Sequence, residues 1–444
     1  MMTLVLSGGT VVSSLEPPVI ERADVVVEGG RVSVLGTATD GGTKLDCSGC
    51  LIVPGNVCAH THLYSALARG MPYSLAPPEN FVQVLQRIWW RLDRALDEES
   101  IRASALVGGL EALLCGTTTV IDHHASPNAV DGSLDIVATA LEELGMRSVL
   151  CYETSDRDGD EIAAAGVREN ERFLARHLPL ARGMVGAHAS FTLSPETLDA
   201  CVDVSERTGA GLHIHVAEDA SDQQDAVERF GIRVVPRLEK AGVLHDGALL
   251  AHCVHLNEAE TASVRESGAS IAHNPTSNMN NSVGHAAVAA LGDRVALGTD
   301  GIGADMFAEA KAAYFRARDD DVSFPIGWPT SRLAEGARLV GRLFEETTFG
   351  RIEPGAPADL VVLDSPVPTP MTAENLSGHW IFGLASRAVR DVVVAGELVV
   401  RERRLVKVDQ DELAARAAEV ARRLWDRSAT IAPHGFDPKG GGAS

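Results

Sequence analysis

Hydrophobic and polar positions follow two different patterns along the chain. Up to about residue 55, short valine-rich runs are separated by glycine-rich turns, which is typical of β-strands. From about residue 51 to 320, apolar runs of strand length alternate with longer stretches of helical periodicity. Beyond residue 350 the strand-like pattern returns, with a hairpin pattern around Gly396. The two ends of the chain therefore resemble each other and differ from the middle.

The middle of the chain contains eight strand-like runs, each followed by a helical stretch. The predicted strands are 51–62, 117–125, 147–153, 183–191, 211–218, 248–256, 270–278 and 295–301. The predicted helices include 97–115, 134–144, 161–178 and 195–208, and the seventh is a short one at 286–291. Eight successive βα units predict a parallel (β/α)8 TIM-like barrel. The alternative, an open doubly wound sheet, usually has a glycine-rich phosphate loop after its first strand, and the sequence has none there.

The length of 444 residues fits one large barrel plus a smaller domain. We expect the fold class to be α/β, with a small β-sandwich domain built from both chain ends. The expected parts are 1–55 and 351–405 for the small β domain, 56–350 for the barrel, and 406–444 for a C-terminal helix and flexible tail.

Histidines and carboxylates recur where the predicted barrel strands end. His60 and His62 lie two apart on the first strand, so both imidazoles project to the same side. The other strand ends carry His188, His213 and His215 with Glu218, His252, His273 with Asn274, and Asp300. Any one of these is more often a satisfied structural residue, and Asp300 alone could cap the next helix. A purely structural role for all of them together is not expected, because burying ionisable groups at the mouth of an apolar barrel costs free energy unless they have a partner.

Three imidazoles and one carboxylate suit a divalent cation such as zinc or Fe(II), with a coordination position left for water. Such a cation lowers the pKa of that water towards about 7. Glu218 is placed to carry protons from the water to a substrate. We interpret His213 and His255 as structural, and leave the adjacent pair His123 and His124 open.

These residues fall into motifs that resemble the amidohydrolase superfamily. The motifs are His60-x-His62, His215-x-x-Glu218, the run 251–255, the run 273–278, the run 298–301 and the Pro-Gly-x-x-Ala-Asp-Leu run at 354–360. Within the superfamily the chain is similar to the aminohydrolase branch, which includes triazine hydrolases, guanine deaminases and adenosine-type deaminases.

The resemblance implies a role for each of these residues. It implies that one metal ion is held by His60, His62, His215 and Asp300. It also implies that Glu218 shuttles protons and that His252 orients or polarises the attacked group. Binuclear relatives use a lysine on the fourth strand, but the run 186–189 has none, which favours a single ion and makes His188 a substrate contact.

The expected reaction is hydrolytic deamination of an amino-substituted nitrogen heterocycle such as guanine, an oxopurine or a pterin. The expected catalytic residues are Glu218, His252 and Asp300, and the expected substrate contacts are His188, Asn274, Trp89 and Trp90. Two alternatives remain open: hydrolysis of a cyclic amide or carbon–halogen bond on a related ring, and a non-catalytic scaffold. Loss of ligands would mark a scaffold, and no ligand is missing.

Charge and cysteine content restrict the partners. Thirty-nine Lys and Arg against 61 Asp and Glu give a net charge of −22, which argues against binding to a phosphate backbone. The Pro-Cys-x-x-Cys signature of nucleic-acid deaminases is missing too. With no signal peptide, no membrane-spanning run and an odd number of cysteines, seven, we expect a cytoplasmic protein with reduced thiols, including the Cys47–Cys50 pair. We expect a homodimer with a small-molecule substrate and no nucleic-acid or membrane partner.

Overall fold

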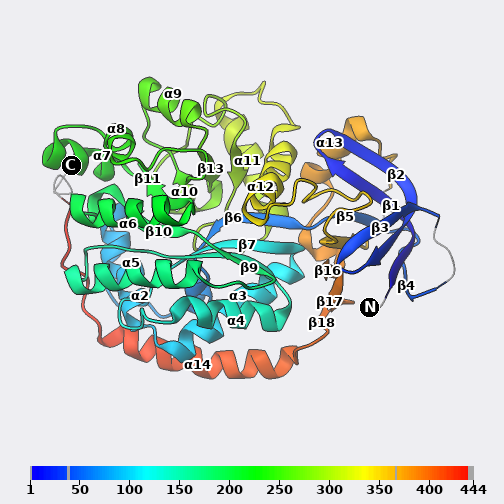
Figure 1. The fold of residues 1–444 in the computed structure, drawn as a ribbon, viewed down its shortest axis with the longest axis horizontal. Helices are drawn as coiled ribbons and strands as arrows, with labels where there is room; N and C mark the ends of the chain where they lie inside the picture. Colours follow the sequence, from blue (N-terminus) through cyan, green and yellow to red (C-terminus); the bar gives the residue numbers. More distant parts are fainter. Residues whose placement is uncertain (1–2, 38–40, 366–367, 439–444) are drawn as a thin grey trace.

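A computed structural model describes residues 3–37, 41–365 and 368–438. It consists of a barrel and a smaller sheet beside it, which occupies the right-hand side of Figure 1. The smaller sheet has nine strands, hydrogen-bonded in the order β18-β17-β16-β15-β5-β1-β2-β3, with β4 paired to β1. These strands are β1 (Leu4–Leu15), β2 (Pro18–Glu28), β3 (Arg31–Gly36), β4 (Thr43–Asp46), β5 (Leu51–Pro54), β15 (Leu360–Leu363), β16 (Val389–Val394), β17 (Glu397–Arg401) and β18 (Arg404–Leu405).

The junction between the two chain ends lies inside this sheet, where β15 pairs antiparallel with β5. Its buried face carries valine, leucine and isoleucine side chains from both ends, such as Leu6, Val25, Ile52, Leu360 and Val393. Burying these β-branched and aliphatic residues stabilises the pairing of segments that are more than 300 positions apart. The prediction of a small β domain built from both ends is confirmed, and its strands form one continuous sheet.

The central part of the chain forms a ring of parallel strands. The strands are β6 (Asn56–Thr61), β7 (Thr117–His124), β8 (Arg147–Tyr152), β9 (Ala181–Gly183), β10 (Val185–Ala189), β11 (Leu212–Val216), β12 (Leu249–His252), β13 (Ser270–His273) and β14 (Val295–Leu297). β9 and β10 are two pieces of one barrel strand: β9 pairs with β8 and β10 pairs with β11. Parallel bridges Thr61–Asp300 and Thr154–Ala187 join the two groups of strands. The predicted (β/α)8 barrel is confirmed.

Helices surround the barrel (Figure 1). They include α3 (Glu98–Leu114), α4 (Ser133–Leu144), α5 (Asp160–Leu174), α6 (Pro195–Thr208), α7 (Ala220–Phe230), α8 (Val234–Ala241), α9 (Glu258–Ser267), α11 (Met306–Asp320) and α12 (Trp328–Phe344). Capping residues determine where several of these helices begin: Asp97 forms a capping box with Ser100, and Asn257 forms one with Glu260. The predicted helix at 286–291 is wrong. The helix after β13 is instead α10 (Pro275–Asn280), which starts at a proline in its first turn.

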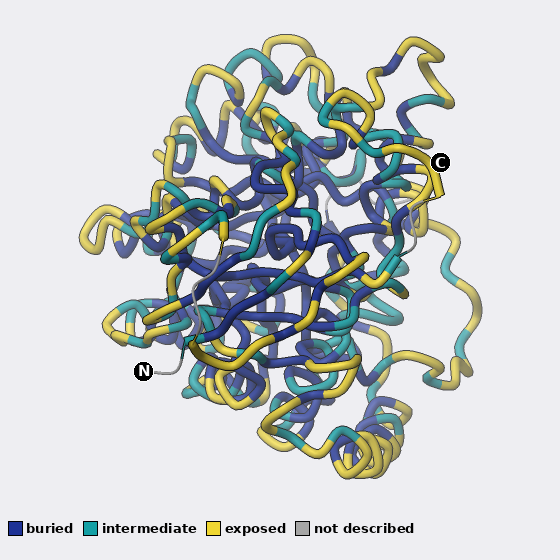
Figure 2. Tube along the Cα trace, turned by 90° about the vertical axis from the view of Figure 1, so that its right-hand side faces the viewer, coloured by how far each residue is buried: buried dark blue, intermediate teal, exposed yellow. Residues whose placement is uncertain are grey.

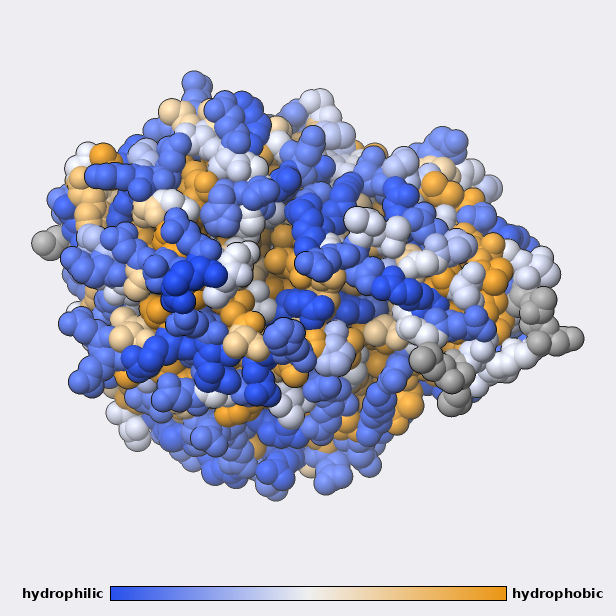
Figure 3. All heavy atoms as spheres, in the orientation of Figure 1, coloured by the Kyte–Doolittle hydropathy of each residue, from blue (hydrophilic) through white to orange (hydrophobic). Residues whose placement is uncertain are grey.

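The buried strands run through the middle of the molecule, and the exposed residues lie on the loops and outer helix faces (Figure 2). On the face drawn in Figure 3, hydrophilic side chains predominate, as the large net charge leads one to expect. None of the helices in the described ranges is both long enough and apolar enough to cross a bilayer.

The last described part of the chain runs along the barrel. Helix α14 (Gln410–Thr430) packs against α3 and against α2 (Trp90–Ala95), and the chain then continues away from the small sheet (Figure 1). Residues 431–438 pack onto the barrel; the flexible tail was predicted for residues 435–444, of which residues 439–444 lie outside the described residues. The predicted domain boundaries stay a prediction.

Candidate active site

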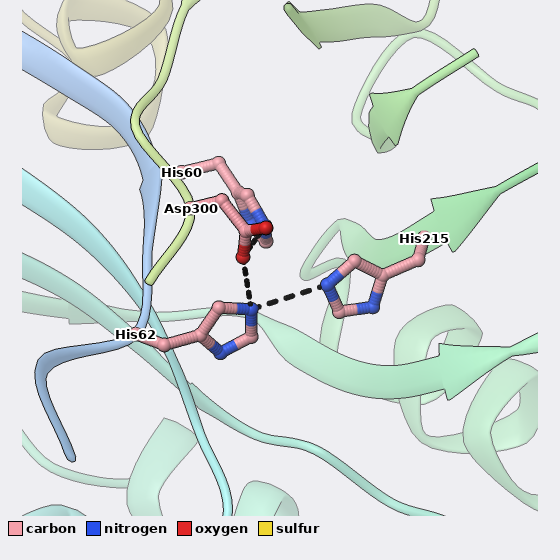
Figure 4. Close-up of side chains that lie close together, drawn as sticks. All are labelled: His60, His62, His215 and Asp300. Atoms are coloured by element: carbon pink, nitrogen blue, oxygen red, sulfur yellow. Dashed lines mark hydrogen bonds and ion pairs between the residues drawn. The ribbon is translucent and has the colours of Figure 1, made fainter. Parts of the chain in front are cut away.

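Three imidazoles and one carboxylate meet where β6, β11 and β14 end. His60 lies on β6 and His62 directly follows it, His215 lies on β11, and Asp300 follows β14. One potential ligand atom from each of the four lies within 4.8 Å of all the others. The Nε2 atom of His62 is 3.0 Å from Oδ1 of Asp300 and 3.2 Å from Nε2 of His215. Figure 4 shows His62 directed at both partners, with His60 beside the carboxylate.

Backbone carbonyls fix the tautomers of two of these histidines. Nδ1 of His62 is 2.6 Å from the carbonyl oxygen of His123, and Nδ1 of His215 is 2.8 Å from that of His188. A carbonyl oxygen can only accept, so each Nδ1 carries a proton and each Nε2 turns its lone pair towards the centre. A hydrogen bond of this kind to the outer nitrogen is the usual support of a metal-binding histidine.

The arrangement requires a positive charge at its centre. Nε2 of His60 is fully buried and has no hydrogen-bond partner, and it lies 3.6 Å from Oδ1 of Asp300. Burial lowers the pKa of His62, but the hydrogen bond and charge of Asp300 outweigh it and raise that pKa to about 9. Without a metal ion, His62 would therefore hold a proton at this position. Three imidazole nitrogens and one carboxylate oxygen fit a divalent ion such as zinc or Fe(II).

His60 is oriented by another histidine rather than by a carbonyl. Its Nδ1 is 2.9 Å from Nε2 of His213, whose own Nδ1 lies 3.6 Å from Sγ of Cys151. All three side chains are buried. If His60 presents Nε2 to the centre, its Nδ1 donates to His213. His213 is thus a structural residue that contacts a proposed ligand, and its spacing of two from His215 places both rings on the same side of β11.

Glu218 and His252 lie next to this cluster and face each other. Oε2 of Glu218 is 3.6 Å from Nε2 of His252, and Nδ1 of His252 is 2.8 Å from Oδ1 of Asn278. Since Asn278 offers an oxygen, His252 donates from Nδ1 and leaves Nε2 as an acceptor; that atom is buried and has no hydrogen-bond partner. Burial lowers the pKa of His252, which favours the neutral ring.

The carboxyl groups of Glu218 and Asp300 have opposite protonation tendencies. Burial, followed by the negative charge of Asp300, raises the pKa of Glu218 well above its usual range. Burial also acts on Asp300, but the neighbouring imidazoles of His60 and His62 outweigh it and hold its pKa well below the usual range. Two carboxyl groups whose pKa values are shifted in opposite directions can serve as a proton carrier and an anion.

A partly enclosed cavity opens onto this cluster. Its lining comprises His62, Tyr64, Phe81, Leu85, Trp89, Trp90, Glu153, His188, Ala189, Phe191, His215, Glu218, Asp222, Asn281 and Asp300. Three of the four predicted substrate contacts, Trp89, Trp90 and His188, therefore face the cavity. Asn274 does not: its side chain is fully buried against Gly298 and is not part of the lining.

A model of the amidohydrolase family matches residues 51–399, which is most of the chain. The chain belongs to the amidohydrolase family. A 5-methylthioadenosine/S-adenosylhomocysteine deaminase from Desulforudis audaxviator is 33% identical over 422 residues, covering 90% of this chain and 94% of the relative. A 5'-deoxyadenosine deaminase from Methanosarcina mazei is 28% identical over 421 residues, covering 92% and 95%.

A solved structure has the same fold as this amidohydrolase. A zinc-bound adenosine deaminase from Xanthomonas campestris superposes with a TM-score of 0.82 at 25% identity, covering 96% of this chain and 99% of that one. The predicted family and its hydrolase class are confirmed.

A buried charged cluster on one side of the cavity of this amidohydrolase was missed by sequence analysis. Oε1 of Glu153, which follows β8, accepts a 2.8 Å hydrogen bond from Arg157, whose Nη2 donates to Asp93 at 2.6 Å. Oε2 of Glu153 lies 3.2 Å from Nδ1 of His123. Burial opposes ionisation, but His188, His123 and Arg157 hold the pKa of Glu153 well below its usual range. Glu153 is the last residue of the predicted strand 147–153, so its position at a strand end could have marked it as a site residue.

The residues whose roles the sequence left undecided lie outside the cavity lining. Nε2 of His123 faces the carbonyl oxygen of His213 at 3.1 Å, and Nε2 of His124 faces the hydroxyl of Ser126 at 3.0 Å. Both histidines are buried. The Cys47–Cys50 pair lies in the small sheet, and both cysteines are free and buried.

Proposed function

We propose that this amidohydrolase is a metal-dependent deaminase, which removes the amino group of a purine-type heterocycle by hydrolysis and releases ammonia. The observation that carries the proposal is the pairing of Glu218 and Asp300 at a cluster of three imidazoles. A proton-holding carboxyl group beside a permanently ionised one is what hydrolysis of a carbon–nitrogen bond needs. The names of the relatives, which are deaminases of adenosine-type nucleosides, support the same reaction class.

The proposed metal ligands are His60, His62, His215 and Asp300, and zinc is the proposed ion. When bound, such an ion supplies a positive charge that lowers the pKa of a water molecule, so that hydroxide forms near neutral pH. The four side chains come from strand ends, and two of the rings are held by backbone carbonyls, so the site is rigid before any ion enters.

Glu218 is the proposed proton carrier. Burial raises the pKa of its carboxyl group well above the usual range, which favours the protonated form that can give a proton to a ring nitrogen next to the attacked carbon. The amino group needs a further proton to leave as ammonia, and the carboxylate left on Glu218 can take that proton from the attacking water. His252 is proposed to orient this water, because its free Nε2 can accept a hydrogen bond from it.

The cavity lining favours an uncharged, flat substrate with several N–H donors. Trp89, Trp90 and Phe81 offer aromatic surfaces, while Glu153 and Glu218 offer carboxylate oxygens. Among the described residues, the lining includes no lysine or arginine, so these residues offer a phosphorylated substrate no counter-charge. We propose an aminopurine ring, with guanine, oxopurines and pterins as the candidates from sequence and adenosine-type nucleosides as those that the relatives suggest. The homodimer and the cytoplasmic location stay predictions.

The proposal is tested with zinc-loaded protein and a panel of guanine, pterin, adenosine, 5'-deoxyadenosine and 5'-methylthioadenosine. Ammonia release and the change in ultraviolet absorbance of the ring are measured together for each compound. Ammonia from at least one of them, with the matching spectral change, is the expected result. If none releases ammonia and the same protein hydrolyses a cyclic amide or a carbon–halogen bond, the deaminase proposal is wrong.

A further inference from the structure

The chain that follows α14 is tied to the wall of the cavity. This C-terminal segment, residues 431–438, crosses η2 (Leu85–Trp89), the π-helical turn that leads into α2. The amide of His434 donates to the carbonyl oxygen of Gln86 at 2.9 Å, and the Gln86 side chain donates to the carbonyl oxygen of Phe436 at 2.8 Å. Arg91 donates from Nε to the carbonyl oxygen of Ile431 at 2.7 Å. Three hydrogen bonds thus fasten the segment to η2 and α2.

Two rings of the C-terminal segment pack on Trp90. The ring centroids of His434 and Phe436 lie 5.3 and 5.8 Å from that of Trp90, at interplanar angles of 73° and 84°. These are edge-to-face contacts, an arrangement that favours one orientation of the indole. Trp90 is only 1% exposed. Phe436 also packs against the cluster of apolar side chains that lines the cavity.

Trp90 meets the cavity on another part of its surface. Its ring lies 6.2 Å from His188 and 6.5 Å from Phe191, both of which belong to the lining, as Trp90 itself does. The C-terminal segment is not part of the lining. Trp90 therefore stands between the C-terminal segment and the space where a flat ring would bind.

His434 also reaches the buried charged cluster. Its Nε2 lies 3.5 Å from Oδ1 of Asp158, and Oδ2 of Asp158 lies 3.4 Å from Nε of Arg157. The guanidinium of Arg157 lies 5.6 Å from the centre of the Trp90 ring and pairs with Glu153. One residue of the segment thus contacts both the aromatic wall and the charges behind it.

We propose that His434 and Phe436 are positioning residues, which hold Trp90 in place so that the cavity binds its heterocycle tightly. This inference rests on the proposed function. A wall that is held in its bound orientation before binding loses less freedom when the ligand arrives. The metal-binding cluster stands on the barrel strands and does not depend on the segment, so loss of the segment weakens binding more than it slows the chemistry.

The test compares a chain ending at Thr430 with a control chain ending at Pro438. A His434→Ala/Phe436→Ala double variant keeps the backbone hydrogen bonds and decides the matter if the shorter chain does not fold. Quenching of tryptophan fluorescence by acrylamide is measured first, because it needs no reaction. Stronger quenching is expected in the shorter chain and in the double variant but not in the control, and a Trp90→Phe background should remove the difference.

The second measurement is kinetic and uses whichever panel compound releases ammonia. We expect KM to rise roughly tenfold in the double variant, with kcat within about twofold and zinc content unchanged. Unchanged quenching, or an unchanged KM despite stronger quenching, would overturn the inference. If no compound is deaminated, the proposed function fails instead, and the quenching comparison still decides whether the segment holds Trp90.

Discussion

The Nε2 atoms of His62 and His215 lie 3.2 Å apart, while the Nδ1 atom of each ring is committed to a backbone carbonyl. Two lone pairs at that distance repel each other unless a cation lies between or beside them. Asp300 supplies a negative charge 3.0 Å from one of them. This relationship is the physical basis for treating the cluster as a metal site.

Replacing His213 should weaken metal binding without touching a ligand. His213→Leu removes the partner of Nδ1 of His60, so that ring can turn and present the wrong nitrogen. Loss of such an outer partner typically lowers metal affinity by roughly 10- to 100-fold. The measurement is competition for zinc with a chelator. His273→Leu is a matched control, because His273 is equally buried on a barrel strand and neither ring nitrogen has a hydrogen-bond partner. Equal affinities in the two variants would remove His213 from the site.

A methyl group added at Gly301 should displace Trp89. A Cβ atom at this position would lie 1.9 Å from the Trp89 indole, closer than any real contact, so the ring must move out of the cavity wall. We expect Gly301→Ala to raise KM roughly tenfold or more. Gly303→Ala is the control, since its nearest neighbour would be 3.7 Å away. Steady-state kinetics of both variants decide the matter, and similar KM values would mean that Trp89 does not contact the substrate.

Stability should depend on pH through Glu309, which is buried in α11 and accepts hydrogen bonds from the amide and hydroxyl of Thr276. Burial outweighs these bonds and raises its pKa to about 7 from 4.5. The folded chain therefore keeps a proton that the unfolded chain releases. The resulting stabilisation is complete below pH 4.5 and is lost as the pH rises through 7.

Glu309→Gln cannot titrate, so its melting temperature relative to the wild type should be higher at pH 8 than at pH 5. The expected change corresponds to about 3 kcal/mol. Thermal unfolding of both proteins at the two pH values measures it. A difference that is the same at both pH values would show that Glu309 is ionised in the fold throughout this range.

The strand ends predicted which side chains lie together, because parallel strands of a barrel end on the same face. The choice of His60, His62, His215 and Asp300 among them came from the resemblance to the amidohydrolase superfamily. What periodicity could not supply was the identity of hydrogen-bond partners. Nδ1 of His60 faces His213 because of how β6 and β11 are staggered along the barrel axis. The spacing of residues within one strand does not determine that stagger.

At three positions the structure differs from the expectation, each for its own physical reason. Asn274 packs against Gly298 instead of lining the cavity, because side-chain direction at a strand end depends on the following turn. The run 286–291 buries Ala286, Val288 and Leu291 as an irregular segment, because apolar spacing over six residues does not distinguish a short helix from a buried loop. The end of the chain looked polar and glycine-rich, but His434 and Phe436 are aromatic anchors that fix it to Trp90.

Ammonia release by zinc-loaded wild type and Glu218→Gln, measured beside the zinc content of each, tests the central claim most directly. The glutamine keeps the shape of the side chain but cannot carry a proton. Glu228→Gln, an exposed position on α7, is the control. We predict turnover at least roughly a hundredfold below wild type for Glu218→Gln alone, with the same zinc content in all three proteins. Near-normal ammonia release by Glu218→Gln would contradict the account.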